Sequence, residues 1–265
     1  MAYRAVTILT LLGSLGLAPL VQAQDYAQAY GQDYARQLTL MGAPDPASRQ
    51  VSVVVRAGLA SNHGLPEGLA LARSAMLAGT EISAADLAAL AERGDGLAAQ
   101  KYVRLLLADP AANPSDIAFF ATVAVSTGRV WTLPDAIAAL HRLDPATEPS
   151  DRTRAYIAML YAHAWAGNAA ALDAVIDLNG EGRLFGALSE ETRARIMAQD
   201  AANGDGRAAL RMALRLLSEP ALSSGQAAMV QDYLTRATAG NNLSVSVTAT
   251  HLLAQRAAAA PVLSQ

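Results

Sequence analysis

Glycines recur along most of this chain at a nearly constant interval, and this interval constrains the fold more than any other feature. Successive members lie 36, 34, 39, 37 and 36 residues apart. They are Gly58, Gly94, Gly128, Gly167, Gly204 and Gly240. A period of this size is typical of stacked helix pairs, in which each unit buries its apolar face only against its neighbours. Because the chain holds 19 glycines, the spacing needs support from the residues around it.

A serine precedes each of these glycines at the position where a helix is expected to begin. The serines are Ser48, Ser83, Ser115, Ser150, Ser189 and Ser224. A serine hydroxyl there accepts hydrogen bonds from the first amides of the helix. Between serine and glycine the apolar residues follow helical spacing, as Ile117, Phe120, Ala121 and Ala124 do. Each interval therefore predicts a helix that ends at a glycine in the left-handed conformation.

A polar residue able to cap a second helix follows four of the glycines. These residues are Asp95, Asn168, Asp205 and Asn241. The second helix is also amphipathic, since Leu210, Ala213, Leu214 and Leu217 fall on one face. We therefore predict an all-α fold over residues 47–256. It would be an α-solenoid of about six stacked helix–turn–helix repeats with a period of about 36 residues.

The first 23 residues are predicted to be a secretory signal peptide. Arg4 supplies the positive start, an uncharged and mostly apolar run extends from Ala5 to Val21, and the small residue Ala23 ends the segment. The alternative is a membrane anchor, but the run is shorter than the roughly 20 residues that a spanning helix needs, and Pro19 breaks it. We expect cleavage after Ala23 and no stable membrane insertion of the mature chain.

The composition excludes several classes of function. The chain has no cysteine, which excludes disulfides, a thiolate nucleophile and a cysteine zinc site. A net charge of -3 argues against a nucleic-acid partner, because neutralising phosphates needs a basic surface. Lys101 is the only lysine, and arginine with abundant alanine is typical of bacteria with GC-rich genomes. Together with the signal peptide, this usage predicts a periplasmic protein.

The segments that flank the repeats differ from them. Residues 24–46 form a tyrosine- and glutamine-rich arm and linker, and residues 257–265 are expected to be a disordered tail. If the arm is helical, Tyr26, Tyr30 and Tyr34 fall on one stripe, and tyrosine is a favoured interface anchor. This stripe is one candidate partner surface. The alternatives are that it caps the first repeat or has no fixed structure.

A search for catalytic, cofactor and metal-binding motifs predicts none of them. The four histidines lack metal-ligand spacing, and no nucleophile elbow or phosphate loop is present. His163 is expected to pack with its aromatic neighbours Tyr161 and Trp165. The best cation candidate is the segment 177–182, which matches the first half of a calcium loop, but Leu188 stands where the closing glutamate is needed. A polar loop between helices explains this segment better.

One junction between helices resembles that of the SEL-one-type repeats, which are relatives of the tetratricopeptide repeats. It runs Ala91-Glu92-Arg93-Gly94 and continues with Ala99-Gln100-Lys101-Tyr102-Val103-Arg104-Leu105. Leu160-Tyr161 with Gly167 is similar to another spacing of that family. A generic tetratricopeptide-like solenoid is the alternative. The resemblance covers the repeated body and implies scaffolding or regulation through protein contacts.

In that family the inner helix of each pair begins after the alanine–glycine junction and lines a concave groove. The corresponding helices of this chain are expected to start near Leu97, Ala169, Arg207 and Leu243. Their polar faces would carry Gln100, Arg104, Arg211 and Arg215 as possible partner-binding residues. Because the arginine fork suits carboxylates, such a groove favours an acidic partner segment. The alternative is that these side chains are ordinary solvated surface.

These observations predict an exported scaffold, adapter or regulator that binds another envelope or periplasmic protein, for example in polysaccharide export or sensor control. No enzyme activity is expected. Two alternatives stay open. One is an enzyme, or the helical accessory domain of one, acting on cell-wall glycan. The other is a holdase-like chaperone for exported chains. The oligomeric state does not follow from the sequence.

Overall fold

The computed structural model describes residues 51–219 and 221–259, and this part of the chain consists of helices and connecting loops without a β-sheet. The helices are α2 (Glu67–Leu77), α3 (Ala84–Glu92), α4 (Gly96–Ala108), α5 (Pro114–Ser126), the short 3-10 helix η2 (Val130–Thr132), α6 (Leu133–Leu140), α7 (Ser150–Trp165), α8 (Ala169–Leu178), α9 (Glu190–Asn203), α10 (Arg207–Leu217), α11 (Ser224–Thr238) and α12 (Leu243–Ala259). The predicted all-α class is confirmed. The predicted signal peptide and the tyrosine arm with Tyr26, Tyr30 and Tyr34 lie outside the described residues.

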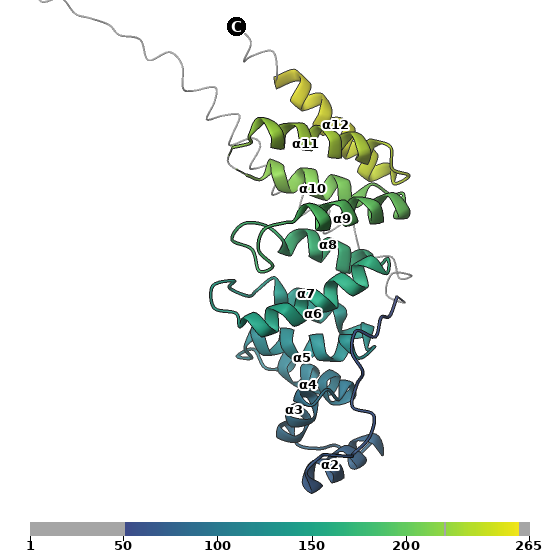
Figure 1. Ribbon diagram of the computed structural model, residues 1–265, viewed down its shortest axis with the longest axis vertical. Coiled ribbons are helices and arrows are strands. Elements are labelled where there is room, and N and C mark those ends of the chain that lie inside the picture. The colour runs from purple at the N-terminus through teal and green to yellow at the C-terminus, as the bar shows by residue number, and fades with distance from the viewer. Residues whose placement is uncertain (1–50, 220, 260–265) are drawn as a thin grey trace, which may run out of the picture.

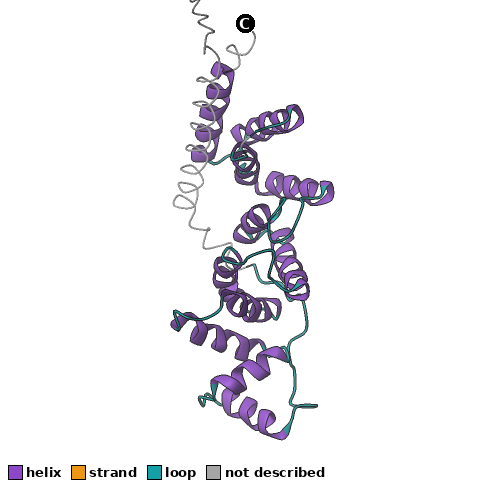
Figure 2. Ribbon diagram, turned by 90° about the vertical axis from the view of Figure 1, so that its left-hand side faces the viewer, coloured by secondary structure: helices purple, strands orange, loops and turns teal. Residues whose placement is uncertain are grey.

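The helices follow one another along the long axis of the molecule, from α2 at one end to α12 at the other (Figures 1 and 2). Each helix from α3 onward packs against its partner in the pairs α3–α4, α5–α6, α7–α8, α9–α10 and α11–α12. Neighbouring pairs meet through α4 and α5, α5 and α7, α8 and α10, and α10 and α11. Buried alanines such as Ala98, Ala121 and Ala209 let these helices approach closely, so one core continues from pair to pair.

The first predicted repeat is wrong in its first half. Among the described residues before Gly58, from residue 51 onward, no helix forms. Residues 51–66, here called the strap, are non-helical, with bends and turns at 61–65, before α2 begins. The run Val51-Ser52-Val53-Val54-Val55 explains the difference, because β-branched side chains lose rotamer freedom in a helix and favour extended backbone. The described residues therefore contain five helix pairs and the single helix α2, where six pairs were expected.

The strap lies along the ends of several helices that are distant in sequence (Figure 1). The amides of Val55 and Arg56 donate to the Ser126 carbonyl at the end of α5, at 2.8 and 3.1 Å. The Leu59 amide donates to the Gly94 carbonyl beyond α3 at 3.1 Å. The Val53 amide donates to Nε2 of His163 on α7 at 3.4 Å. The strap thus connects three helix pairs in place of the missing helix.

The repeated glycines end helices at four of the six predicted positions. Gly94, Gly128, Gly167 and Gly204 have φ angles of 87, 95, 94 and 69°. Gly58 lies in the strap. Gly240 does not have a positive φ. A glycine is needed there for another reason, because a Cβ would lie 2.5 Å from the Asp205 carbonyl oxygen. Backbone conformation therefore requires glycine at four positions, and the close packing of two loops requires it at position 240.

The predicted capping residues are confirmed at some helices and displaced at others. Ser83 and Ser189 accept amides of α3 and α9, and Asp95 and Asn168 cap α4 and α8. Elsewhere the cap precedes the predicted serine: Asn113 caps α5, Pro149 precedes α7, and Ser223 caps α11. Asn242, not Asn241, accepts an amide of α12. At the C-terminus, α12 continues to Ala259, beyond the boundary expected at residue 256.

We expect Gly204→Ala to lower the free energy of unfolding by about 1–2 kcal/mol, because an L-residue is strained in the left-handed region. The nearest atom to a Cβ at Gly204 is Nδ2 of Asn241 at 3.6 Å, so the loss would reflect backbone strain and not a clash. Gly68 on α2 is the matched control, since it has no positive φ and open space around it. Gly68→Ala should stabilise by about 0.5–1 kcal/mol. Urea unfolding of both variants measures the difference.

Candidate functional site

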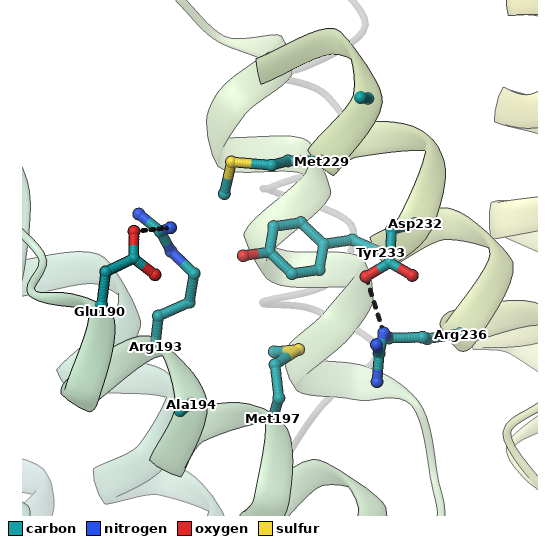
Figure 3. A pocket seen from close by; sticks show the side chains of 9 residues that line it. Glu190, Arg193, Ala194, Met197, Met229, Asp232, Tyr233 and Arg236 are labelled. Atoms are coloured by element: carbon teal, nitrogen blue, oxygen red, sulfur yellow. Dashed lines mark hydrogen bonds and ion pairs between the residues drawn. The ribbon is translucent and has the colours of Figure 1, made fainter. Parts of the chain in front are cut away.

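Helices α9 and α11 belong to neighbouring pairs and face each other across an opening. Of its 14 residues, α9 buries only Ile196 and Asp200, so it presents too little apolar surface to pack closely on α11. The result is a cleft of about 530 Å³ between the two helices, here called the α9–α11 cleft (Figure 3). Its lining comprises Glu190, Arg193, Ala194, Met197, Ala228, Met229, Asp232, Tyr233 and Arg236.

The walls of this cleft are apolar and its ends are charged. Figure 3 shows Met197 and Met229 on either side of the Tyr233 ring, whose hydroxyl points across the cleft toward Arg193. One end carries the ion pair of Arg193 with Glu190 at 2.6 Å, and the other that of Arg236 with Asp232 at 2.8 Å. Methionine is flexible and polarisable, so these walls can adapt to differently shaped apolar side chains.

Two hydrogen-bond donors at the cleft have no acceptor. The Tyr233 hydroxyl and Nε of Arg193 are both buried and unpaired. Burial raises the pKa of Tyr233, so its phenol stays protonated at neutral pH and keeps its donor. A buried donor without a partner costs about 1–3 kcal/mol. An acceptor group that reaches these two atoms would therefore be stabilised in the cleft.

A second, polar pocket of about 660 Å³ adjoins the α9–α11 cleft and shares Arg193 and Met229 with it. We call it the arginine pocket, because Arg183 of the α8–α9 loop and Arg215 of α10 also line it. The two openings therefore adjoin at these two side chains, and together they are called the groove. A bound segment could place a charged group in one part and an apolar group in the other.

The two arginines are held in place by the end of α8. Nη1 of Arg183 donates to the Asp177 carbonyl at 3.2 Å, and Nη1 of Arg215 donates to the Ile176 carbonyl at 2.9 Å. Arg215 reaches this position by crossing Gly180, where a Cβ would collide with its guanidinium group. Gly180 also has a φ of 143°, which L-residues rarely adopt. A glycine is therefore needed in this loop for Arg215 to reach the pocket.

The segment 177–182, the best cation candidate of the sequence, is occupied by the protein's own groups. Asp177 pairs with Arg211, and Asn179 is buried with its amide nitrogen donating to the Val175 carbonyl at 2.7 Å. The Asn179 oxygen accepts from the Tyr161 hydroxyl at 3.0 Å. Among the described residues, no group of three or more His, Cys, Asp or Glu side chains could hold a metal ion. The segment comprises the last two residues of α8 and the first four residues of the loop that follows.

The four arginine-groove residues predicted from the sequence lie in different surroundings. Arg211 forms ion pairs with Asp177 and, at 3.5 Å, with Asp173. Burial lowers the pKa of Arg211, but these two carboxylates outweigh it and raise the pKa overall. Arg215 lines the arginine pocket. Arg104 is exposed and Gln100 is half-buried, both on the distant helix α4. The structure therefore brings only Arg215 of the four into the groove.

Several groove residues are absent from the sequence predictions. They are Arg183, Arg193, Met197, Met229 and Tyr233. Two of the pairs have a spacing of four residues, Arg193 with Met197 and Met229 with Tyr233, which places each pair on one helix face. The spacing indicates that the two residues of each pair lie on the same face of their helix. It does not indicate that a cleft lies between the faces of the two helices.

His163 is buried and contacts the strap, whereas Tyr161 and Trp165 pack on each other at 5.4 Å between ring centroids. Nδ1 of His163 donates to the Met159 carbonyl at 2.9 Å, which leaves Nε2 as the acceptor for the Val53 amide. Protonation would place a hydrogen on Nε2, facing the Val53 N–H. Charging of this histidine should therefore break the strap contact.

We expect protonation of His163 to destabilise the protein. Burial lowers the pKa of His163, and the Met159 carbonyl, which raises it, does not compensate. The folded pKa is below the unfolded value of about 6.5. The stabilisation that the neutral histidine gives is therefore complete above about pH 6.5, and it is lost as the pH falls from there through the folded pKa. Urea unfolding at mildly acidic and neutral pH should show a smaller pH difference for His163→Gln than for the wild type. The exposed His251 provides the control, and His251→Gln should retain the full difference. Equal pH dependence of the wild type and His163→Gln would contradict this expectation.

Within the described residues, no helix is both long and apolar enough to cross a membrane. Comparison of the chain with models of protein families, with curated proteins and with solved structures gives no match.

Proposed function

We propose that this protein is an exported helical-repeat scaffold or adapter. Its stacked helix pairs form an α-solenoid of the tetratricopeptide-like kind, and it binds another protein of the bacterial envelope. The signal peptide predicted in residues 1–23 gives the compartment. The repeated helix pairs favour a binding role, because stacked pairs offer extended surfaces to partners.

The α9–α11 cleft carries this proposal. It has methionine walls and two buried donors without acceptors, and it adjoins a pocket with anchored arginines. Methionine, tyrosine and arginine are enriched at protein interfaces, and here all three types line one groove. A partner that fills the cleft would bury the methionines and supply the missing acceptors.

The test captures partners of the full chain in the organism that encodes it. Cells expressing the chain with a C-terminal tag are crosslinked, and the envelope fraction is purified on the tag. One stoichiometric partner is the expected result. Met197→Gln with Met229→Gln should reduce its recovery about tenfold, because polar groups would replace the apolar walls. Leu243→Gln is the control, since Leu243 is exposed on α12 outside the cleft.

Other outcomes of this experiment identify the alternatives. Capture of many unfolded chains with similar efficiency would favour a holdase-like chaperone. Retention of cell-wall glycan would favour the enzyme or accessory-domain reading. A single partner whose recovery is unchanged in the methionine variant would place the interface elsewhere, with the tyrosine arm of residues 24–46 as the next candidate.

A further inference from the structure

Arg183 and Arg215 differ from the other arginines around them. Arg193, Arg207 and Arg211 each form an ion pair with a carboxylate, whereas neither Arg183 nor Arg215 has one within 4.0 Å among the described residues. Their printed partners are backbone carbonyls at the end of α8. A guanidinium group has five N–H donors, so each side chain keeps donors for a ligand. These two arginines are oriented but not neutralised.

The two positive charges also repel each other. Burial lowers the pKa of Arg215, and the charge of Arg183 lowers it further, while the carboxylates of Asp177 and Glu219 raise it without offsetting the decrease. Glu181 and Glu219 are exposed side chains of the pocket lining. Asp177 pairs with Arg211, and Glu219 accepts from the Gln226 amide at 2.7 Å. An anion between Arg183 and Arg215 would remove the repulsion and complete the hydrogen bonding of both side chains.

We infer that the arginine pocket binds the side-chain carboxylate of an Asp or Glu in the partner, and that apolar side chains next to this acid enter the α9–α11 cleft. The inference rests on the proposed function and specifies the chemistry of the partner. It follows from the adjacency of the two openings, which share Arg193 and Met229 in their linings. The cleft extends past Tyr233 to Arg236, so the groove has room for several residues on the cleft side of the acid.

The Arg193 and Tyr233 donors fit the same segment. Arg193 lines both openings, and Figure 3 shows the Tyr233 hydroxyl pointing toward Arg193 from the middle of the cleft. Backbone carbonyls that follow the acidic residue would reach them when the methionine side chains move aside. A partner segment would therefore meet a carboxylate site, two donors and an apolar cleft in succession, which gives the interface a direction.

The experiment selects binding segments from a phage-displayed library of random peptides on the immobilised mature chain. We expect the enriched peptides to contain Asp or Glu next to Leu, Met or Phe. Synthetic peptides of the enriched sequence are then titrated by fluorescence anisotropy. Arg183→Gln should weaken their binding about tenfold, as loss of one charge-assisted contact does, and replacing Glu by Gln in the peptide should have a similar effect.

Matched variants separate this site from general charge effects. Arg195→Gln is the control, because Arg195 is exposed on α9 and pairs only with Glu191 at the helix surface. It should leave peptide affinity unchanged. Arg215→Lys keeps the charge but loses the fork, so it should weaken binding several-fold while circular dichroism stays that of the wild type. Since Arg183 is exposed, Arg183→Gln tests the inference even if changes at Arg215 impair folding.

Three results would overturn the inference. Enriched peptides without an acid would exclude a carboxylate site, and equal binding of acidic peptides to wild type and Arg183→Gln would place the site elsewhere. Binding of inorganic phosphate with the same arginine dependence, but of no peptide, would assign the pocket to a small anion. The proposed function fails separately. If crosslinking captures a partner whose recovery depends on Met197 and Met229 but not on Arg183 and Arg215, the scaffold role stands and only this inference is lost.

Discussion

Replacing Asp95 by alanine is expected to lower the free energy of unfolding by about 3–5 kcal/mol, because Asp95 belongs to a buried ion pair. Its Oδ2 accepts from Nε of Arg73 at 2.7 Å, and both side chains are almost fully buried. Its Oδ1 accepts the amides of Leu97 and Ala98 at 3.0 and 2.9 Å and so caps α4. The substitution would remove the cap and leave the Arg73 charge buried without its carboxylate.

The same ion pair holds the strap. Nη2 of Arg73 donates to the Leu59 carbonyl at 2.7 Å, and Nη1 donates to Oδ1 of Asn62 at 2.9 Å. Loss of Asp95 should therefore also loosen the strap where it passes α2, and amide hydrogen exchange in residues 59–66 should rise. The effect reaches beyond one repeat because the strap is bonded to three helix pairs.

Two variants control this prediction. Asp232→Ala removes a carboxylate of similar geometry, 2.8 Å from Arg236, but both side chains of that pair are more than half exposed. It should cost less than about 1 kcal/mol, because exposed ion pairs contribute little. Asp95→Asn keeps an acceptor for the α4 amides, so its loss in the free energy of unfolding should lie between those of Asp95→Ala and Asp232→Ala. An Asp95→Ala loss no greater than that of Asp232→Ala, measured by urea unfolding, would contradict the role assigned to this buried pair.

Gly240→Ala should destabilise the protein by about 3 kcal/mol, more than Gly204→Ala, although only Gly204 has a positive φ. A Cβ at position 240 would lie 2.5 Å from the carbonyl oxygen of Asp205, 2.7 Å from its carbonyl carbon and 2.9 Å from the Gly206 amide nitrogen. These are backbone atoms, which cannot move aside as a side chain can. The loops that end α9 and α11 would have to separate.

This prediction concerns the contact between the last two helix pairs. The Asn241 amide donates to the Gly204 carbonyl at 2.9 Å across the same interface, so separating the loops also breaks this hydrogen bond. Gly225→Ala is the control, because Gly225 lies in the first turn of α11 with only the Ser223 hydroxyl near its Cβ, at 4.0 Å. Thermal unfolding should show a marked decrease for Gly240→Ala and little change for Gly225→Ala. Similar melting temperatures for the two would show that the loops separate at low cost.

The positions of most helices follow from local physical chemistry, and the sequence predicts them for that reason. The left-handed glycines at Gly94 and Gly204 and the caps Ser83 and Asp95 act within one or two helical turns, so neighbouring residues indicate them. The valines of residues 51–55 also indicate the extended start of the strap, but the regular glycine spacing led to the prediction of a helix there. There the β-branched run outweighed the repeat.

The sequence by itself determined the helical class, the pairing of helices and the turn glycines, because these depend on contacts between residues close in the chain. Only the tertiary structure decided the groove and the partners of its arginines. Arg211 and Arg215 lie four residues apart on α10 and look alike in the sequence. Arg211 forms an ion pair with Asp177, whereas Arg215 crosses Gly180 and forms no ion pair with a carboxylate of the described residues. That difference arises from Asp177 at the end of α8 and Gly180 in the loop that follows, both more than 30 residues before the two arginines. The cleft likewise exists because α9 lacks the apolar surface to pack on α11, and a gap between two helices is a property of neither sequence alone.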